Sequence, residues 1–104
     1  MEWYKDIHNR KLRMSDERRE HVETDHPEMW GQMDRVREAL LDPDIVVRSR
    51  ADLNVELYYC HYENTPVTEK YLCVVVKAAN GDLFVITAYF TDTVKRGEVL
   101  WEKK

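Results

Sequence analysis

The dipeptide Asn80-Gly81 lies between two apolar, β-branched runs, and together they form the stretch Lys70 to Phe90, KYLCVVVKAANGDLFVITAYF. Asn-Gly is the strongest short-range signal for a β-hairpin, because both residues tolerate positive φ in a two-residue turn. No other part of the sequence is apolar over such a length. We therefore expect two central strands, with the rest of the chain packed around them.

The composition is typical of one folded domain covering residues 1–104. The chain has 104 residues, of which 43% are hydrophobic and 35% charged, with only 3 Gly and 3 Pro. One core and few flexible linkers are therefore expected. No apolar run approaches the roughly 20 residues that span a bilayer, and the first residues lack the apolar centre of a signal peptide. We expect a cytoplasmic protein without a membrane partner.

The cysteines and the net charge narrow the classes of function further. Cys60 and Cys73 show no C-x-x-C spacing, so in a reducing compartment we expect both to be small buried hydrophobes. The formal net charge of -4 argues mildly against a partner bound mainly through its phosphates. Basic residues nevertheless cluster between Asn9 and Arg19.

Two helices are expected in residues 15–41. Ser15 followed by two acids is typical of a helix start, because the hydroxyl caps the first turn and the helix dipole favours acids there. This helix runs to about Asp25, since Pro27 disfavours helical geometry in the residue before it. A second helix is expected over Pro27–Leu41, because its apolar residues share one helical face. Those residues are Met29, Met33, Val36 and Leu40.

Strands are expected on both sides of these helices. Residues 1–14 form a packed arm with a short, charged edge strand. Residues 45–90 form a sheet, and residues 91–104 form a tail that begins with a helical turn and packs back through Leu100 and Trp101. The four candidate strands of the sheet are Ile45–Arg50, Val55–Tyr62, Lys70–Ala79 and Asp82–Phe90. The predicted fold is α+β, with two N-terminal helices packed on one four- to five-stranded, mostly antiparallel sheet.

Alternation along these strands predicts which side chains share a face of the sheet. Tyr58 and Tyr59 are adjacent, so they face opposite sides. Thr87 and Tyr89 are expected to share a face with Val85.

Several common catalytic motifs are absent. The chain has no G-x-x-x-x-G-K or G-x-G-x-x-G phosphate loop and no G-x-S-x-G acyl-transfer motif. His21 and His26 lack the i, i+4 spacing of a helical zinc pair. We therefore expect no metal site and no cofactor.

The remaining polar residue types are those that a metal-free ribonuclease needs. Such an enzyme needs a base for the ribose 2′-OH, an acid for the leaving 5′ oxygen, and cations with hydroxyl donors for the phosphorane charge. Histidine suits the acid and base roles, because its pKa lies near neutrality. The candidates are His21, His26, Glu28, Arg48, Arg50, Tyr58, Tyr59, Thr87, Tyr89 and Lys95.

The order of several motifs resembles that of a known family. Between about Arg13 and Asp92 the chain carries HVETDHPEM, then LLDPDIVVRSR, then YLCVVVK and FVITAYFTD. This order is similar to that of the small phage-type domains of the barnase–EndoU–colicin–RelE-like (BECR) nuclease superfamily. In those domains a histidine-bearing helix runs into a His-Pro-Glu turn and a second helix, and a Pro-Asp element then opens a four-stranded antiparallel sheet.

The resemblance implies a site for RNA cleavage. It implies that His21 is a catalytic acid or base above the sheet, and that Arg48 or Arg50 binds phosphate. Thr87 and Tyr89 would belong to the same catalytic site. Tyr59 would bind the substrate on the same face. With the candidates from residue type added, the residues expected to hold the substrate are His26, Glu28, Arg50, Tyr59 and Lys95.

Simpler structural explanations remain open for these side chains. His21 could be an exposed helix residue, His26 a turn residue that caps the second helix, and Glu28 an acid placed for the helix dipole. Thr87 and Tyr89 could form a buried, hydrogen-bonded pair.

The leading hypothesis is a metal-independent endoribonuclease domain that cleaves RNA by 2′-OH attack on the phosphodiester. Its role would be that of a toxin in a toxin–antitoxin pair or of a mobile-element accessory, with RNA and a cognate antitoxin as partners. The alternative is a catalytically inactive interaction module of the same fold that binds protein or nucleic acid.

Overall fold

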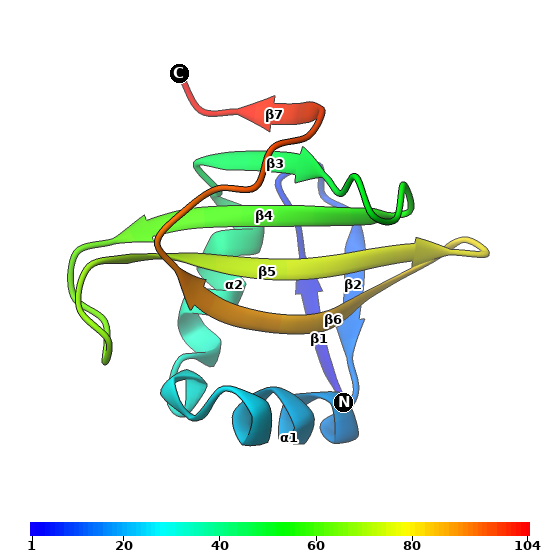
Figure 1. Cartoon of the computed structure of the whole chain (residues 1–104). Coiled ribbons are helices and arrows are strands. Elements are labelled where there is room, and N and C mark those ends of the chain that lie inside the picture. Colours follow the sequence, from blue (N-terminus) through cyan, green and yellow to red (C-terminus); the bar gives the residue numbers. More distant parts are fainter.

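Seven strands form one mixed sheet in the structure, a computed structural model that describes all of residues 1–104 (Figure 1). The strand order is β1-β2-β6-β5-β4-β3-β7. The elements in chain order are β1 (Glu2–Lys5), β2 (Lys11–Met14), α1 (Asp16–Asp25), the 3₁₀ helix η1 (Pro27–Met29), α2 (Met33–Leu41), β3 (Ile45–Arg48), β4 (Val55–Tyr62), β5 (Lys70–Ala79), β6 (Asp82–Thr91) and β7 (Val99–Glu102).

The predicted four- to five-stranded sheet is therefore wrong, although the domain is α+β. Two helices lie against a larger, seven-stranded sheet, in which β2 runs parallel to β6 at a single registered pair, Arg13 with Phe84. The extra edge strands, β1 and β7, are only four residues long and lack a clear apolar alternation. Strand β7 forms by pairing with β3, which is distant in sequence, and β1 forms by pairing with the neighbouring β2. The residues of β1 and β7 alone do not predict these pairings.

The layers are visible in Figure 1. The strands β4, β5 and β6 lie in front, and α2 lies behind them. The strands β1 and β2, at one end of the same sheet, run across behind β4, β5 and β6. The helix α1 runs along the β6 side. One face of β4, β5 and β6 is thus covered by α2, β1 and β2, while the opposite face carries no helix.

The central hairpin forms as predicted. Asn80 (φ 54°) and Gly81 (φ 79°) both adopt positive φ, which is the geometry that an Asn-Gly turn favours. The register then shifts within the hairpin, because Val75 pairs with Thr87 while Val76 pairs with Val85. The extra residue in β6 makes a β-bulge, which changes the face to which the following side chains point.

This bulge overturns the predicted face of the β6 residues. Val85 packs in the helix-covered core, whereas Tyr89 packs with Cys73 on the helix-free face. Thr87 lies opposite Val75, which also belongs to that second cluster. The prediction that Thr87 and Tyr89 share a face with Val85 is wrong, since it assumed unbroken alternation.

The helices begin as expected but divide differently. Ser15 caps α1 by accepting a hydrogen bond from the Arg18 backbone N at 3.1 Å, and α1 ends at Asp25. The single helix predicted over Pro27–Leu41 is wrong, because it divides into η1 and α2. Gly31 lies between them at φ 76°, a conformation that interrupts a right-handed helix and suits glycine.

Two apolar clusters lie on the two sides of the sheet. The larger one lies between the sheet and α2 and includes Val36, Leu40 and Tyr58. Its partly buried members include Leu100 and Trp101, as predicted for the tail. The smaller cluster lies on the opposite side of the sheet. We call that side the helix-free face, and its buried members are Val47, Val55, Leu57, Tyr59 and Cys73. Tyr58 and Tyr59 therefore face opposite sides, as predicted.

The segment between β6 and β7 crosses the helix-free face (Figure 1). Val94 packs on its apolar cluster. A Cβ atom at Gly97 would lie 2.3 Å from the Arg48 carbonyl oxygen, so only glycine fits where this segment passes β3. The helical turn predicted for the tail does not form, because the segment is held in an extended crossing before β7.

No helix of the structure is long and apolar enough to cross a membrane.

Candidate functional site

A row of hydrogen-bonding side chains crosses three strands on the helix-free face. Tyr59 of β4 lies opposite Cys73 of β5, and Cys73 lies opposite Tyr89 of β6. Directly opposed residues have adjacent side chains, so a phenol lies on each side of one thiol. Both phenols act to lower the pKa of the Cys73 thiol, against the larger effect of burial. We refer to these residues as the Tyr59–Cys73–Tyr89 row.

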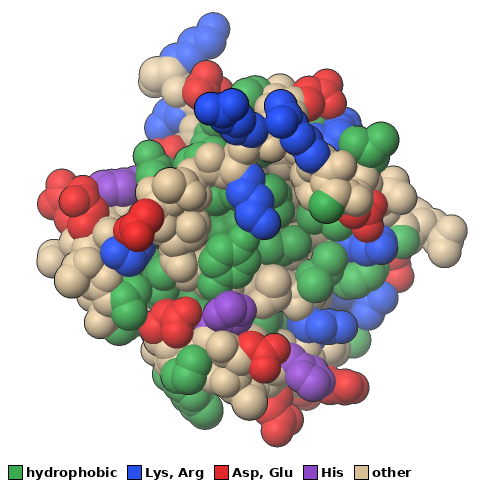
Figure 2. All heavy atoms as spheres, viewed as in Figure 1, with side chains coloured by type: hydrophobic (Ala, Val, Ile, Leu, Met, Phe, Trp, Pro, Cys, Tyr) green, Lys and Arg blue, Asp and Glu red, His purple; other side chains and the backbone are tan.

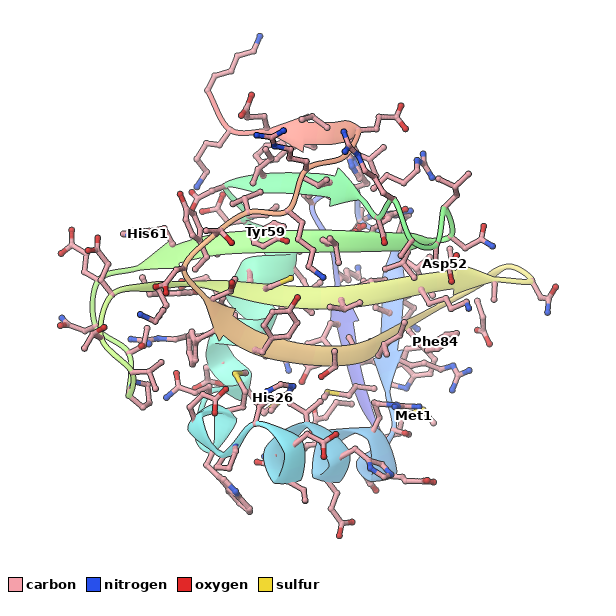
Figure 3. The ribbon with its side chains drawn as sticks, in the orientation of Figure 1. Met1, His26, Asp52, Tyr59, His61 and Phe84 are labelled. Atoms are coloured by element: carbon pink, nitrogen blue, oxygen red, sulfur yellow. The ribbon has the colours of Figure 1, made fainter.

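His26 extends this row beyond β6. Its imidazole ring lies 5.5 Å from the Tyr89 ring, centroid to centroid, and Figure 3 shows His26 between α1 and β6. Pro27 ends the helix, and His26 leaves it with φ −131° and ψ 78°. His26 is the N-cap residue of η1, in line with the prediction that it caps the second helix, but its side chain makes no capping hydrogen bond. It is free to lie against the sheet.

Glu28 lies on the other side of the imidazole. Its Oε1 atom is 3.6 Å from His26 Nδ1. A carboxylate oxygen at this position can hold the ring orientation by accepting from Nδ1. The geometry leaves Nε2 as the nitrogen available to a ligand.

Lys95 reaches the row from the crossing segment. Its backbone N donates to the Tyr59 hydroxyl at 3.1 Å, and its ammonium charge acts to lower the pKa of the Cys73 thiol. The side chain is exposed. A cation therefore lies above the helix-free face, while Thr87 lies two residues from Tyr89 on the same strand and face.

Burial sets the protonation of the row. It is the main reason that the pKa of Tyr59 is raised to about 12, and the nearby Cys73 makes a smaller contribution in the same direction. The hydrogen bond from the Lys95 backbone N–H acts to lower the pKa of Tyr59. Burial also raises the pKa of Tyr89. It raises the pKa of Cys73 to about 11, although hydrogen bonds from both tyrosines act in the opposite direction. At neutral pH the two phenols and the thiol keep their protons, so they can donate hydrogen bonds but cannot serve as bases.

The surface around the row has a mixed character. Figure 2 shows hydrophobic side chains gathered in the middle of this face, with Lys and Arg side chains above them and a histidine directly below. Figure 3 places Tyr59 and His26 on opposite sides of this central region. The face offers apolar contact, neutral hydroxyl donors, a cation and an imidazole.

The structure gathers five of the predicted site residues and leaves others apart. His26, Tyr59, Thr87, Tyr89 and Lys95 share the helix-free face, and Glu28 contacts His26. Tyr58, by contrast, belongs to the opposite core.

His21 lies in different surroundings. Its side chain is 57% exposed on α1, with Nε2 3.6 Å from Glu17 Oε1. Around it is a small surface hollow lined by Glu17, Glu20 and Thr24. Acidic neighbours rather than phosphate-binding groups surround this histidine.

The two arginines also make other contacts. Arg48 binds Glu98 Oε1 through Nε at 2.8 Å and the Leu53 carbonyl oxygen through a terminal nitrogen at 2.9 Å. These bonds tie the crossing segment to the turn after β3. Arg50 lies exposed in that turn.

Sequence reasoning missed two features of this face. Cys73 was expected only as a buried hydrophobe, but it joins two tyrosines. A second group of rings continues the row, because Tyr71 packs edge-on against Tyr59 at 6.3 Å and against His61 at 5.2 Å. The signal lay in the pairing of Val55–Tyr62 with Lys70–Ala79, whose register places these rings side by side.

No group of three or more His, Cys, Asp or Glu side chains is arranged to hold a metal ion. Comparison of the chain with family models, with curated proteins and with solved structures gave no match in any of the three.

Proposed function

We propose that this domain is a metal-independent endoribonuclease whose active site is the helix-free face. The observation that carries the proposal is the position of His26 against Tyr89, 5.5 Å between ring centroids, on the face that also presents Thr87 and Lys95. An imidazole beside neutral hydroxyl donors and a cation supplies what phosphodiester cleavage without a metal requires.

The roles follow from the protonation states. His26 Nε2 removes the proton from the ribose 2′-OH, while Glu28 beside Nδ1 orients the ring. The 2′ oxygen attacks phosphorus and forms a bond to it, and the bond to the 5′ oxygen breaks. Tyr89 retains its proton at neutral pH because burial raises its pKa, so it can protonate the leaving oxygen. Lys95 and Thr87 stabilise the phosphorane charge.

The substrate class follows from the nucleophile. A 2′-OH within the substrate removes the need to activate a water molecule, so RNA is cleaved and DNA is not. The products are a 2′,3′-cyclic phosphate and a 5′-OH end.

We further propose that the domain belongs to the BECR superfamily and acts in the cytoplasm as a toxin with a cognate antitoxin, or as a mobile-element accessory. The order of α1, the His-Pro-Glu turn, α2 and then antiparallel β3 to β6 supports the family assignment.

The test is RNA cleavage by purified protein in buffer containing EDTA. Wild type should release fragments ending in 2′,3′-cyclic phosphate, and His26→Ala should lose about 100-fold or more of the rate. His21→Ala is the matched control, because it removes a histidine from the same helical region, and it should lose less than His26→Ala. A substrate with 2′-O-methyl at every position should remain intact. Undiminished cleavage by His26→Ala would contradict the assignment.

A second function is favoured by the burial of Tyr59. Its side chain is 0% exposed and its hydroxyl already accepts the Lys95 backbone N–H, as in a packing residue. A catalytically inactive module that binds nucleic acid or protein on this face would then bind the 2′-O-methyl RNA or a protein partner but leave unmodified RNA intact.

A further inference from the structure

The strand β1 forms one end of the sheet and pairs only with β2. The Asp6 backbone N donates to the Arg10 carbonyl at 3.0 Å, which closes the hairpin at a hydrogen-bonded pair. Hydrogen-bonded and non-hydrogen-bonded pairs alternate along antiparallel strands. Trp3 and Lys5 are therefore the residues whose backbone N–H and C=O groups point away from β2.

A groove runs along this open edge. Its volume is about 290 Å³, and its lining is Trp3, Tyr4, Lys5, Lys11, Arg37 and Leu41. Three of these residues are consecutive in β1, and two lie one helical turn apart in α2. The β1 edge is thus one wall and α2 is the other. We call this the β1 groove.

The β1 groove is apolar at its sides. Trp3 is 50% exposed and Leu41 is 45% exposed, although both are large hydrophobic residues. Arg37 lies over the Tyr4 ring at 4.7 Å, and the Lys11 ammonium lies over the Trp3 ring at 5.2 Å. Cations and rings are interleaved along its length.

The charge of the β1 groove is opposite to that of the whole chain. Lys5, Lys11 and Arg37 line it, and the acid that pairs with one of them is Glu2 of β1, whose Oε2 lies 3.8 Å from Arg37. The chain as a whole carries a formal net charge of -4. Beyond Leu41 the sign reverses, because the neighbouring hollow is lined by Asp34, Glu38 and Asp42. Negative charge on a ligand is favoured beside β1 and opposed beyond Leu41.

We propose that the β1 groove binds an extended, acidic segment of a partner protein, which adds a strand to β1. The backbone groups of Trp3 and Lys5 hydrogen-bond the added strand. A bulky apolar side chain of the partner lies between Trp3 and Leu41, and its acidic residues pair with Lys5, Lys11 and Arg37. A peptide fits better than RNA, because the open strand edge and the apolar walls match backbone amides and aliphatic side chains rather than sugar and phosphate.

This surface is separate from the helix-free face, so its test does not depend on ribonuclease activity. The probe is a displayed library of random 12-residue peptides selected on the full-length protein. We expect enriched peptides to be acidic, with apolar residues at alternate positions. In ¹⁵N-labelled protein, the best peptide should shift the amide signals of Trp3 and Lys5.

Two variants sharpen the result. Lys5→Glu places a like charge against the peptide and should weaken binding about tenfold or more, and Leu41→Asp should do the same by removing the apolar wall. Lys104→Glu, at the other end of the chain, is the matched charge control and should bind as wild type does. Unchanged thermal unfolding establishes that each variant is folded.

Three outcomes would overturn the proposal. The first is the absence of acidic, extended peptides from the selection, or binding that Lys5→Glu leaves unchanged. The second is concentration-dependent dimerisation in sedimentation that Lys5→Glu abolishes, which would assign the groove to a second copy of the chain. The third is competition for the groove by the 2′-O-methyl RNA, which would assign it to nucleic acid.

Discussion

Tyr58 and Tyr59 are neighbours in β4, both 0% exposed, yet they serve different sides of the sheet. The Tyr58 hydroxyl donates to Asp6 Oδ2 at 2.7 Å and accepts from Arg10 at 2.8 Å. Arg10 in turn binds Glu56 at 2.6 Å. The Tyr59 hydroxyl receives only the Lys95 backbone N–H, apart from its contact with Cys73.

This difference distinguishes the face of Tyr58, whose polar side chains hold the fold together, from the helix-free face. Asp6, Arg10, Glu56 and Tyr58, which we call the N-terminal network, bind the β1–β2 hairpin to β4 with charged hydrogen bonds. Asp6 is 2% exposed and both its oxygens are used. On the helix-free face the donors are neutral, and the imidazole is held by packing and one carboxylate. Such groups can exchange partners with a ligand without breaking the fold.

The largest effect on stability is expected from Asp6→Ala. The substitution leaves Arg10 and Tyr58 without their shared partner, and loss of one member of a buried ionic network is strongly destabilising. We expect the free energy of unfolding to fall by about 3 kcal/mol, as measured by urea denaturation. A loss equal to that of a surface substitution would show that the network does not hold the hairpin.

A smaller effect should separate the two tyrosines. Tyr58→Phe removes a hydroxyl bonded to charged groups and should cost about 2 kcal/mol. Tyr59→Phe removes one hydrogen bond between neutral groups, which the Tyr59 hydroxyl accepts from the Lys95 backbone N–H, and should cost about 1 kcal/mol. Equal losses in paired urea titrations would remove the distinction between the faces.

The smallest effect is in alkaline stability. Burial raises the pKa of Tyr59 from 10.0 to about 12 and that of Cys73 from 9.0 to about 11. Because the folded pKa values are raised, the stability from these groups is complete below about pH 9 and is lost between about pH 9 and 12. Tyr59→Phe should lose less stability over that range than wild type, because it lacks the ionisable phenol, when both are unfolded in urea at stepped pH. If the unfolding free energies of the two proteins fall in parallel as the pH rises, the Tyr59 phenol is not the origin of the alkaline loss of stability.

Acidic pH should instead destabilise the N-terminal network. Burial raises the pKa of Asp6, but hydrogen bonds from Tyr58 and Arg10 lower it more, so the net pKa is lowered from 3.8. Its contribution to stability is therefore present above about pH 4 and is lost as the pH falls below that.

Local sequence carried much of this fold where the signals were strong. Asn80-Gly81, Ser15 and the alternation of Val55–Tyr62 each act over a few residues, and each prediction from them is confirmed. Strand β7 depends on β3, which is distant in sequence, and β1 pairs with the neighbouring β2 without a clear apolar alternation of its own. Periodicity shows neither strand.

The candidate site shows the same limit. The residue types were recognised, but the bulge between Val85 and Thr87 and the turn at Pro27 decide where they point. His26, rather than His21, lies against Tyr89 because Pro27 turns the chain just there. Alternation and helix periodicity cannot report either irregularity.

The central claim is that the helix-free face, and not the N-terminal network, meets RNA. The most direct measurement is titration of a short 2′-O-methyl RNA, which the proposed reaction cannot cleave, into ¹⁵N-labelled protein followed by NMR. We predict that the signals of His26, Thr87, Tyr89 and Lys95 shift together and saturate, while those of Asp6 and the rest of the N-terminal network stay fixed. Shifts confined to the N-terminal network or the β1 groove, or no shifts at all, would contradict the account.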